Sequence, residues 1–438
     1  MDDGILVSAI EKILKSGMDR VDLLALESNT ITAASRLGKP ETIIQADAAA
    51  VTIRFSKGKR SAVIATDNVD ELNEDSFVEK ARFAVENSPE EEVGFRPSFS
   101  ELCKSFDYPD ISDEQKVSAE ELIANALECE QTALGVKGIT NSEGAEASSC
   151  RSRIIVMKDD NFYACYKRTV HQLAVVTLAE KDGSLERDWD FSKKIYYSDL
   201  KTPEQIAKKA AERTLKKMGA QKISSRKVPV IFDRRIAGRL LGDLLEALNG
   251  ASVAKGISFL KNKLYRKIFC EGLSVTDSCK VPRGLRSHPF DSDGLECFDL
   301  SLITNGTLNS FLLNTRYANM LGLKSTAHAK GFDGISPHNA RVENGSVSFE
   351  DLLKSIKNGL YVTEVLGRGL NPVTGNYSQG AAGFLIENGE ITRPVHEITI
   401  AGNFEDMFSD CVVASDLEIE TGIDSPSLLI NNITVGGT

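Results

Sequence analysis

Histidine, tryptophan and closely spaced cysteines are scarce in this chain of 438 residues, which has five histidines, one tryptophan and eight cysteines. No two cysteines are separated by only two or four residues, and no histidine has another histidine within five residues. These absences exclude the spacings of zinc ribbons, CxxC redox sites and HExxH helices. Each histidine is therefore expected to have a structural or surface role. The five are His171, His288, His328, His338 and His396.

Basic charge and long apolar runs are also lacking. The chain has 52 Lys and Arg against 63 Asp and Glu, a net charge of -11. A protein that neutralises many phosphates needs a basic face, so we expect no nucleic-acid partner. No stretch reaches 18 apolar residues, and two acids precede the first short amphipathic run, so we expect no membrane span and no signal peptide. The cysteines are too sparse for a disulfide framework, which predicts a cytoplasmic protein with reduced thiols.

Hydrophobic periodicity predicts an α+β fold in two lobes. The first lobe, residues 1–222, is predicted to mix helices with strands. Its expected helices cover a short stretch near the start and residues 73–87, 112–134 and 203–217, and its expected strands cover residues 21–25, 50–55, 61–66 and stretches between 139 and 179.

The second lobe, residues 223–438, is predicted to be β-rich and mostly antiparallel. A strand at 228–232 and a helix at 235–248 open it, and Asn249-Gly250 is predicted to end that helix. Two Asn-Gly dipeptides predict hairpins with type I′ turns. The hairpins join strands 299–304 and 308–313, and strands 383–387 and 390–393; a further strand is expected at 396–400.

Glycines and the single tryptophan give no sign of a nucleotide site. Gly375, Gly380 and Gly383 are followed by no Lys-Ser/Thr pair and precede a strand, so we interpret them as turn glycines rather than a phosphate-binding loop. Trp189 lies among charged residues and is expected to be an anchor between the lobes.

Paired carboxylates are the remaining candidates for chemistry. Asp291 with Asp293, or Glu418 with Glu420, could face one side of a strand and hold a hard cation. Acidic turns produce the same pattern in any chain with this many acids. No GxSxG elbow is present. From the residues alone, no catalytic constellation stands out.

Long segments of the second lobe carry a specific resemblance to a known family. They are GISFL (256–260), PFDSDG (289–294), LLNTRYA (312–318), LGLKST (321–326), GNYSQGAAGF (375–384), ENGEITRP (387–394) and EITIAGN (397–403). These segments resemble the TldD/PmbA family, whose members are also described as modulators of DNA gyrase, and look like its PmbA (TldE) branch rather than its TldD branch. The resemblance covers most of residues 228–410.

The resemblance implies a cytoplasmic metalloprotease built from one TldD and one TldE subunit, which digests or matures unfolded peptides. In the TldD subunit, an HExxxH helix and a later cysteine bind zinc. The positions that match the helix motif here are Leu241, Gly242 and Glu246, and the later cysteine region falls near residues 420–422. Leucine offers no lone pair, glycine offers no base, and one carboxylate cannot replace a ligand set. We therefore expect no catalytic residue, metal or cofactor in this chain, and zinc in a TldD-type partner.

By the same resemblance, this chain supplies one wall of a closed peptide cavity between the two subunits, where peptide pairs with a sheet edge. We expect this wall in residues 314–326 and 375–383; the alternative is that these segments only shape turns. The predicted peptide-facing residues are Asn314, Arg316, Tyr317, Lys324, Ser325, Thr326, Tyr377 and Ser378.

Two other functions stay open at this point. The chain could be a binding or regulatory protein without proteolysis, acting as a homodimer or on a gyrase-related partner, and the absence of a TldD-type gene from the same genome would favour this. It could also be an independent hydrolase that uses Asp291, Asp293 or another carboxylate pair with a different metal.

Overall fold

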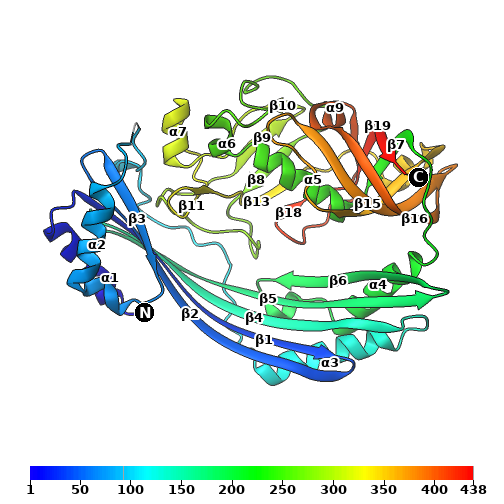
Figure 1. Cartoon of the computed structure of the whole chain (residues 1–438), viewed down its shortest axis with the longest axis horizontal. Helices are drawn as coiled ribbons and strands as arrows, with labels where there is room; N and C mark the ends of the chain where they lie inside the picture. Colours follow the sequence, from blue (N-terminus) through cyan, green and yellow to red (C-terminus); the bar gives the residue numbers. More distant parts are fainter. Residues whose placement is uncertain (92, 438) are drawn as a thin grey trace.

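The computed structural model describes residues 1–91 and 93–437, and its sheets form two lobes that lie side by side (Figure 1). Strands β1–β6 build the N-terminal lobe and strands β7–β19 build the C-terminal lobe. The chain is 24% helical and 41% strand, which confirms the predicted α+β class with a β-rich second part. No helix in the described residues is long and apolar enough to cross a lipid bilayer.

A single antiparallel sheet in the order β3-β2-β1-β4-β5-β6 forms the N-terminal lobe. Helices cover it at its two ends: α1 and α2 pack with β1 and β2 around one core, and α3 and α4 pack with β1, β4 and β5 around another (Figure 1). The elements are α1 Asp3–Lys15, β1 Arg20–Arg36, β2 Lys39–Lys57, β3 Arg60–Thr66, α2 Asp75–Glu86, α3 Ala119–Leu134, β4 Asn141–Lys158, β5 Phe162–Lys181, β6 Ser184–Lys194 and α4 Pro203–Lys216, with short 3-10 turns at Asp70–Asn73, Phe99–Glu101 and Tyr197–Asp199.

The predicted helix at 112–134 is wrong in its first seven residues. Helix α3 begins at Ala119, because Ser118 and Glu121 form a capping box in which each side chain accepts the other residue's backbone N–H. The preceding segment is held in an extended path by Asp113, whose carboxylate accepts the N–H groups of Gln115 and Tyr197 at 2.9 Å each. The predicted helices 73–87 and 203–217 are confirmed as α2 and α4.

The first two strands are much longer than predicted. β1 and β2 run for 17 and 19 residues and pair along their whole length. Residues 39–48 of β2 are exposed on both faces of the sheet, so this part of the strand has no alternation of apolar and polar residues to reveal it. The predicted hairpin between 50–55 and 61–66 is confirmed at the end of β2 and in β3.

Two mostly antiparallel sheets form the C-terminal lobe, in the orders β16-β15-β14-β7-β19-β17 and β10-β9-β8-β13-β18. A two-stranded ribbon, β11-β12, accompanies them. The elements are β7 Arg226–Phe232, α5 Arg234–Ala247, α6 Gly250–Ala254, β8 Val275–Ser278, β9 Leu300–Thr304, β10 Thr307–Leu308, α7 Thr315–Leu321, β11 Ala329–Lys330, β12 Gly334–Ile335, β13 Asn339–Val342, α8 Phe349–Lys354, β14 Asn358–Leu366, β15 Asn376–Glu387, β16 Glu390–Asn403, α9 Phe404–Ser409, β17 Cys411–Val413, β18 Ile423–Asp424 and β19 Leu428–Gly436.

Helix α5 confirms the predicted helix at 235–248, and its leucines enter the largest core of the lobe. The helix also ends where predicted, just before Asn249-Gly250, but Gly250 does not have the positive φ angle of a glycine C-cap. Leu248 already caps α5, and Asn249 instead starts α6 by accepting the N–H of Ala251 at 2.9 Å. Gly250 is required there, because a Cβ would lie 2.8 Å from the carbonyl oxygen of Leu312.

Both Asn-Gly hairpins are confirmed. Each turn has two positive φ angles, 47° and 78° at 305–306 and 53° and 81° at 388–389, as type I′ turns require. The strand predicted at 308–313 is wrong beyond Leu308, because Leu312 leaves the sheet to exchange backbone hydrogen bonds with the α5–α6 junction. The expected strand at 396–400 lies within β16.

The three glycines interpreted as turn residues divide into two groups. Gly375 lies in a turn with a φ of 76°, as predicted. Gly380 and Gly383 lie inside β15, so the turn interpretation is wrong for them. A Cβ on Gly383 would come within 2.0 Å of the carbonyl oxygen of Tyr361, which explains why glycine is needed in mid-strand.

A buried charge cluster joins the two lobes. The carboxylate of Asp22 on β1 accepts hydrogen bonds from Arg54 at 2.8 Å and Lys158 at 3.1 Å, and Arg96 lies 3.3 Å away. The guanidinium of Arg54 stacks against Phe332, a residue of the C-terminal lobe, 4.6 Å from the ring centroid. Arg54 therefore both neutralises Asp22 within the N-terminal lobe and contacts the C-terminal lobe.

Candidate active-site cavity

A cavity of about 680 Å³ lies between the two lobes, where β6 faces α5, β14 and β18. In Figure 1, β6 is the strand of the N-terminal sheet that lies nearest to α5 and β18. The residues of its wall include Asp188, Trp189, Phe191, Lys217, Arg235, Gly238, Gly242, Asp243, Glu246, Glu364, Leu366, Glu418, Glu420, Thr421 and Asp424.

One face of α5 forms the wall at the positions that match the HExxxH motif. Gly242 and Glu246 are one helical turn apart and both line the cavity, whereas Leu241 points away into the core with 1% of its surface exposed. Glu420 and Thr421, where the later cysteine of the motif would fall, line the same cavity. The fold thus brings together the two segments that would hold the metal.

The side chains at these positions do not fit a catalytic zinc. Leu241 has no lone pair and is buried, Gly242 has no side chain, and Glu246 supplies a single carboxylate. Among the described residues that line the cavity there is no histidine and no cysteine. That Leu241, Gly242 and Glu246 bind no metal stays a prediction.

The cavity wall carries a network of opposite charges that spans both lobes. Lys217 Nζ lies 2.9 Å from the carboxylate of Asp188 on β6 and 2.6 Å from that of Glu364 on β14. Arg235 on α5 lies 3.5 Å from Asp188. Because Asp188 and Lys217 are almost fully buried, these pairs fix the distance between β6 and the C-terminal lobe.

Asp243 is the wall residue with the most perturbed ionisation. Burial, helped by the nearby carboxylate of Glu246, raises the pKa of Asp243 to about 6, although Arg239 and Arg368 act in the opposite direction. The carboxyl group can therefore change its charge close to neutral pH. It lies one residue from Gly242, at the centre of the α5 wall.

The β6 edge inside the cavity is capped by side chains of the chain itself. β6 ends the order of the N-terminal sheet, so its outer backbone groups have no neighbouring strand in that sheet. Lys217 donates to the carbonyl oxygen of Arg187 at 3.2 Å, Arg213 donates to that of Trp189 at 3.3 Å, and the Trp189 N–H donates to Asp188 at 2.7 Å. Added strands are therefore blocked at these residues.

Trp189 lies at the junction of the lobes, as predicted. The residue remains 46% exposed and lines the cavity, and the guanidinium of Arg235 from the other lobe lies 5.8 Å from the ring centroid. The residue thus both anchors the lobes and offers an aromatic surface to the cavity.

None of the eight predicted peptide-facing residues lines this cavity. Four of them are buried and build local structure in the C-terminal lobe. Asn314 caps α7 by accepting the N–H of Tyr317 at 3.0 Å, Thr326 accepts the N–H of Leu313 at 2.7 Å, and the hydroxyl of Tyr377 donates to Gln379 at 2.6 Å.

The other four are partly or fully exposed. Arg316 reaches across to the N-terminal lobe and lies 2.8 Å from Glu91, and also 3.1 Å from Asp333. Ser325 donates to the carbonyl oxygen of Leu313 at 3.2 Å, while Lys324 and Ser378 are exposed. Contact of any of the eight with peptide across a subunit interface stays a prediction.

The paired carboxylates have structural partners. The two oxygens of Asp291 accept the N–H groups of Asp293, Leu295 and Ala329, each at 3.0 Å, and Asp293 accepts the N–H of Thr315 at 3.0 Å. Three of the four oxygens are thus occupied by backbone donors. Burial and the charge of Asp293 raise the pKa of Asp291, which also disfavours a charged hard-cation site there.

The second carboxylate pair is divided between two cations. Glu418 lies 2.6 Å from Arg234, and Glu420 lies 2.6 Å from Lys201. Both line the cavity, but each is already neutralised by its own ion pair.

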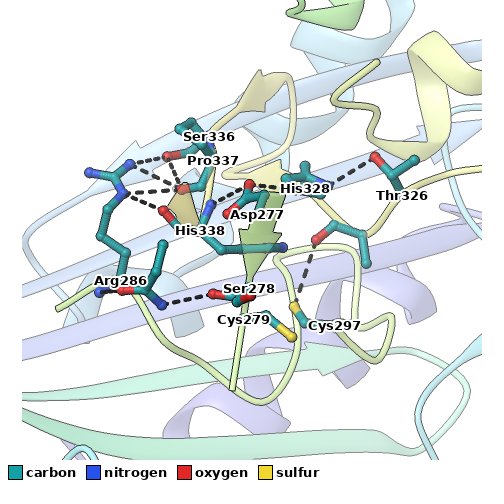
Figure 2. Close-up of polar contacts among 12 residues, drawn as sticks. Asp277, Ser278, Cys279, Arg286, Cys297, Thr326, His328, Ser336, Pro337 and His338 are labelled. Carbon is teal, nitrogen blue, oxygen red and sulfur yellow. Dashed lines mark hydrogen bonds and ion pairs between the residues drawn. The ribbon is translucent and has the colours of Figure 1, made fainter. Parts of the chain in front are cut away.

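Three of the five histidines meet in the C-terminal lobe, which spacing in the sequence did not reveal. The rings of His328 and His338 are stacked with centroids 4.1 Å apart, and His288 lies 4.6 Å from His338. Asp277 lies between His328 and His338 (Figure 2), accepting from His328 Nε2 at 3.1 Å and from the backbone N–H of His338 at 2.9 Å. Only the fold brings these segments together, so no local motif could have found the cluster.

Gly238 and Gly242 provide a test of the cavity wall, because they lie one turn apart on α5. A Cβ on Gly242 would meet no atom within 4 Å, whereas one on Gly238 would lie 2.9 Å from the carbonyl oxygen of Ile423. Glycine inside a helix costs about 1 kcal/mol relative to alanine. We expect Gly242→Ala to raise the free energy of unfolding by about 0.5–1 kcal/mol and Gly238→Ala to lower it, as measured by urea denaturation. Equal effects of the two would mean that the cavity is closed in solution.

Two family models match the chain. The PmbA/TldA metallopeptidase central domain matches residues 112–218, and the PmbA/TldA metallopeptidase C-terminal domain matches residues 225–437. The lobe boundary predicted at 222/223 falls between the two matched regions and stays a prediction.

Curated and solved relatives extend over the whole chain. The metalloprotease PmbA of Escherichia coli O157:H7 is 34% identical over 98% of this chain and 95% of its own length. A protein of Bacteroides thetaiotaomicron described as a modulator of DNA gyrase has a TM-score of 0.91 at 24% identity, covering 100% of this chain and 99% of that one. TldE of Thermococcus kodakarensis has a TM-score of 0.86 at 20% identity, covering 99% and 100%. At these identities the two structures show the shared fold.

Proposed function

Because this chain belongs to the PmbA/TldD metallopeptidase family, we propose that it is the PmbA/TldE-type subunit of a two-component protease. In this proposal it forms one wall of the peptide cavity and lacks the catalytic zinc, which a TldD-type partner supplies. Its substrates are unfolded peptides, which the pair degrades or matures.

The observation that carries the proposal is the wall of the interlobe cavity. The fold places α5 and residues 420–421 around one space, as a metal site of this kind would need, yet that space is lined by Gly242 and Glu246 and not by metal ligands. A cavity that lacks metal-binding side chains suits a subunit that binds substrate while its partner cleaves it.

The chain's own residues supply binding rather than bond cleavage. Trp189, Phe191 and Leu366 offer apolar surface, and the charged pairs around Lys217 offer polar groups. Because the β6 edge at Arg187 and Trp189 is capped by side chains, we expect contact with peptide side chains, and main-chain pairing at another edge of the assembly. Zinc in the partner would polarise the scissile carbonyl and activate water.

A cytoplasmic location belongs to the same proposal. All eight cysteines are free thiols, including Cys270 and Cys411, whose sulfur atoms lie only 2.9 Å apart. Eight cysteines in 438 residues are also too sparse for the disulfide framework of a small secreted domain, which supports a reducing compartment such as the cytoplasm.

The proposal is tested by cleavage of an unstructured protein such as β-casein. This chain alone, a TldD-type companion alone, and the co-purified mixture are compared with and without chelator. We expect the mixture to cleave at least about 100-fold faster than this chain alone, with the activity lost on chelation and restored by zinc.

Two outcomes would contradict the proposal. Cleavage by this chain alone would reveal a catalytic site of its own. A companion that is fully active alone, with no stable complex, would indicate instead a binding or regulatory protein, acting as a homodimer or on a gyrase-related partner.

A further inference from the structure

A group of metal-ligating side chains, two of the three buried, lies in the C-terminal lobe, outside the interlobe cavity. His288, Cys297 and His338 each offer one ligand atom, and these three atoms lie within 4.8 Å of one another. None of the three lines the cavity. His288 and Cys297 come from the irregular segment between β8 and β9, and His338 immediately precedes β13. A shared ion would therefore tie this segment to the sheet.

The ring of His288 is oriented as a metal ligand requires. Its Nδ1 lies 3.0 Å from the carbonyl oxygen of Arg286. A carbonyl oxygen only accepts, so Nδ1 carries the hydrogen and Nε2 keeps its lone pair. Metal-binding histidines in proteins commonly donate their second N–H to a backbone carbonyl in this way.

The ring of His338 has unmet polar groups. The residue is 0% exposed, and neither ring nitrogen has a hydrogen-bond partner among the described residues. Leaving a buried polar group without a partner costs about 1–3 kcal/mol. A coordinate bond to one nitrogen would remove part of this cost.

A buried carboxylate and a largely buried guanidinium, those of Asp277 and Arg286, both lie beside the histidines. The carboxylate of Asp277 is fully buried; its Oδ2 accepts from His328 and from the backbone of His338, and its Oδ1 has no partner among the described residues (Figure 2). Arg286 donates to the carbonyl oxygen of His338 at 3.0 Å and already faces the carboxylate of Asp277, so an ion here would be held by its ligands and not by an unbalanced charge. Thr326 further fixes His328 by a contact of 2.9 Å with its Nδ1.

Sulfur completes the ligand set. The thiol of Cys297 is buried and has only a long contact of 3.6 Å with the carbonyl oxygen of Ala327, and the thiol of Cys279 lies against it (Figure 2). Two imidazoles with one or two thiolates favour a tetrahedral zinc-class ion over calcium or magnesium. Ligand atoms around tetrahedral zinc are roughly 3.3–3.7 Å apart, given Zn–N and Zn–S bonds of about 2.0–2.3 Å. The three ligand atoms, which now lie within 4.8 Å of one another, would therefore need to move by only about 1 Å to coordinate one ion.

We propose that His288, Cys297 and His338 bind one zinc-class divalent ion, with the thiol of Cys279 next to that of Cys297. Binding forms two N–metal bonds and one S–metal bond and releases the thiol proton of Cys297 to solvent. The ion braces the β8–β9 segment and takes no part in peptide cleavage. This site amends the sequence-based expectation that the chain itself holds no metal, and it does not depend on the proposed protease role.

Cobalt substitution of the full chain tests the site directly. The reduced protein is stripped with chelator and titrated with Co²⁺. We expect one ion per chain, a thiolate-to-cobalt charge-transfer band, and the strong visible bands of tetrahedral cobalt, all displaced by equimolar Zn²⁺. Cys297→Ser should abolish the charge-transfer band and weaken binding at least about 100-fold, and His338→Gln should weaken it similarly.

The control is Cys270→Ser, which removes a thiol from the second close cysteine pair, Cys270 and Cys411. It should leave both the stoichiometry and the spectrum unchanged. Loss of the spectrum in Cys270→Ser but not in Cys297→Ser would move the site to that pair and overturn the proposal. So would the absence of stoichiometric cobalt binding by the wild-type chain, a result that needs no variant to fold. Peptide cleavage is not measured, so failure here leaves the proposed function standing.

Discussion

Replacing Asp22 by asparagine should lower the free energy of unfolding by about 3–5 kcal/mol at pH 7, because two buried cations then lose their counter-charge. Arg54 and Lys158 are nearly inaccessible to solvent and both donate to this carboxylate, so neither can turn to water. Urea denaturation followed by the fluorescence of Trp189, the single tryptophan, would measure the loss and would also report whether the interlobe cavity opens at the same time.

The loss should depend on pH in a defined direction. Burial raises the pKa of Asp22, but the charges of Lys158, Arg54 and Arg96 outweigh it and lower the pKa to about 2. A carboxyl group with a lowered pKa in the folded state stabilises fully above its unfolded pKa of about 3.9, and this contribution disappears as the pH falls toward 2. The gap between wild type and Asp22→Asn should therefore shrink below pH 4.

An exposed aspartate serves as the control for this prediction. Asp67→Asn changes the same chemical group on the loop after β3 and should change stability by less than about 0.5 kcal/mol. A loss of less than 1 kcal/mol for Asp22→Asn, or a loss that stays constant from pH 7 to pH 3, would show that the cluster is hydrated in solution.

Filling the interlobe cavity should inhibit the two-subunit protease without preventing its assembly. A phenylalanine at Gly242 would project from α5 into open space, since no atom lies within 4 Å of its Cβ. The ring would occupy the centre of the wall between Asp243 and Glu246. If peptide occupies this cavity, we expect Gly242→Phe to lower kcat/KM for β-casein by at least about tenfold, since steric conflict in a pocket costs over 1 kcal/mol.

Gly272→Phe is the matched control for the filled cavity. Gly272 is exposed in a loop of the same lobe, and its Cβ would also meet no atom within 4 Å. It should leave cleavage and complex formation unchanged. Full activity of Gly242→Phe, with the complex intact on size-exclusion chromatography, would exclude the cavity as the place where substrate binds.

Most elements of the fold could be predicted where local chemistry is decisive. The Asn-Gly turns, the proline-started helix α4 and the leucine stripe of α5 all follow from local conformational preferences and periodicity. The exposed half of β2 could not be predicted, because a strand that faces solvent on both sides shows no alternation of apolar and polar residues. The start of α3 was misplaced because two serines, Ser112 and Ser118, both resemble N-caps, and only Ser118 forms the reciprocal bonds.

The candidate site was only partly accessible from the sequence. The family resemblance identified the positions Leu241, Gly242 and Glu246. The cavity beside them could not be predicted, because its opposite wall is formed by β6 and Trp189 of the other lobe. The histidine cluster was missed for the same reason. His288, His328 and His338 are separated by at least ten residues, and they meet only because β8, β13 and the α7–β11 turn converge.

The position of the last strand has a consequence for biosynthesis. β19 lies between β7 and β17 in the larger sheet of the C-terminal lobe, although β7 ends at residue 232 and β19 begins only at residue 428. Until β19 has been synthesised, β7 has no partner on that side, and the core beneath α5 remains open. Domains generally fold as units during synthesis, and exposed strand edges invite aggregation. The sheet can therefore close on this side only after β19 has been synthesised, and until then the edge of β7 stays exposed.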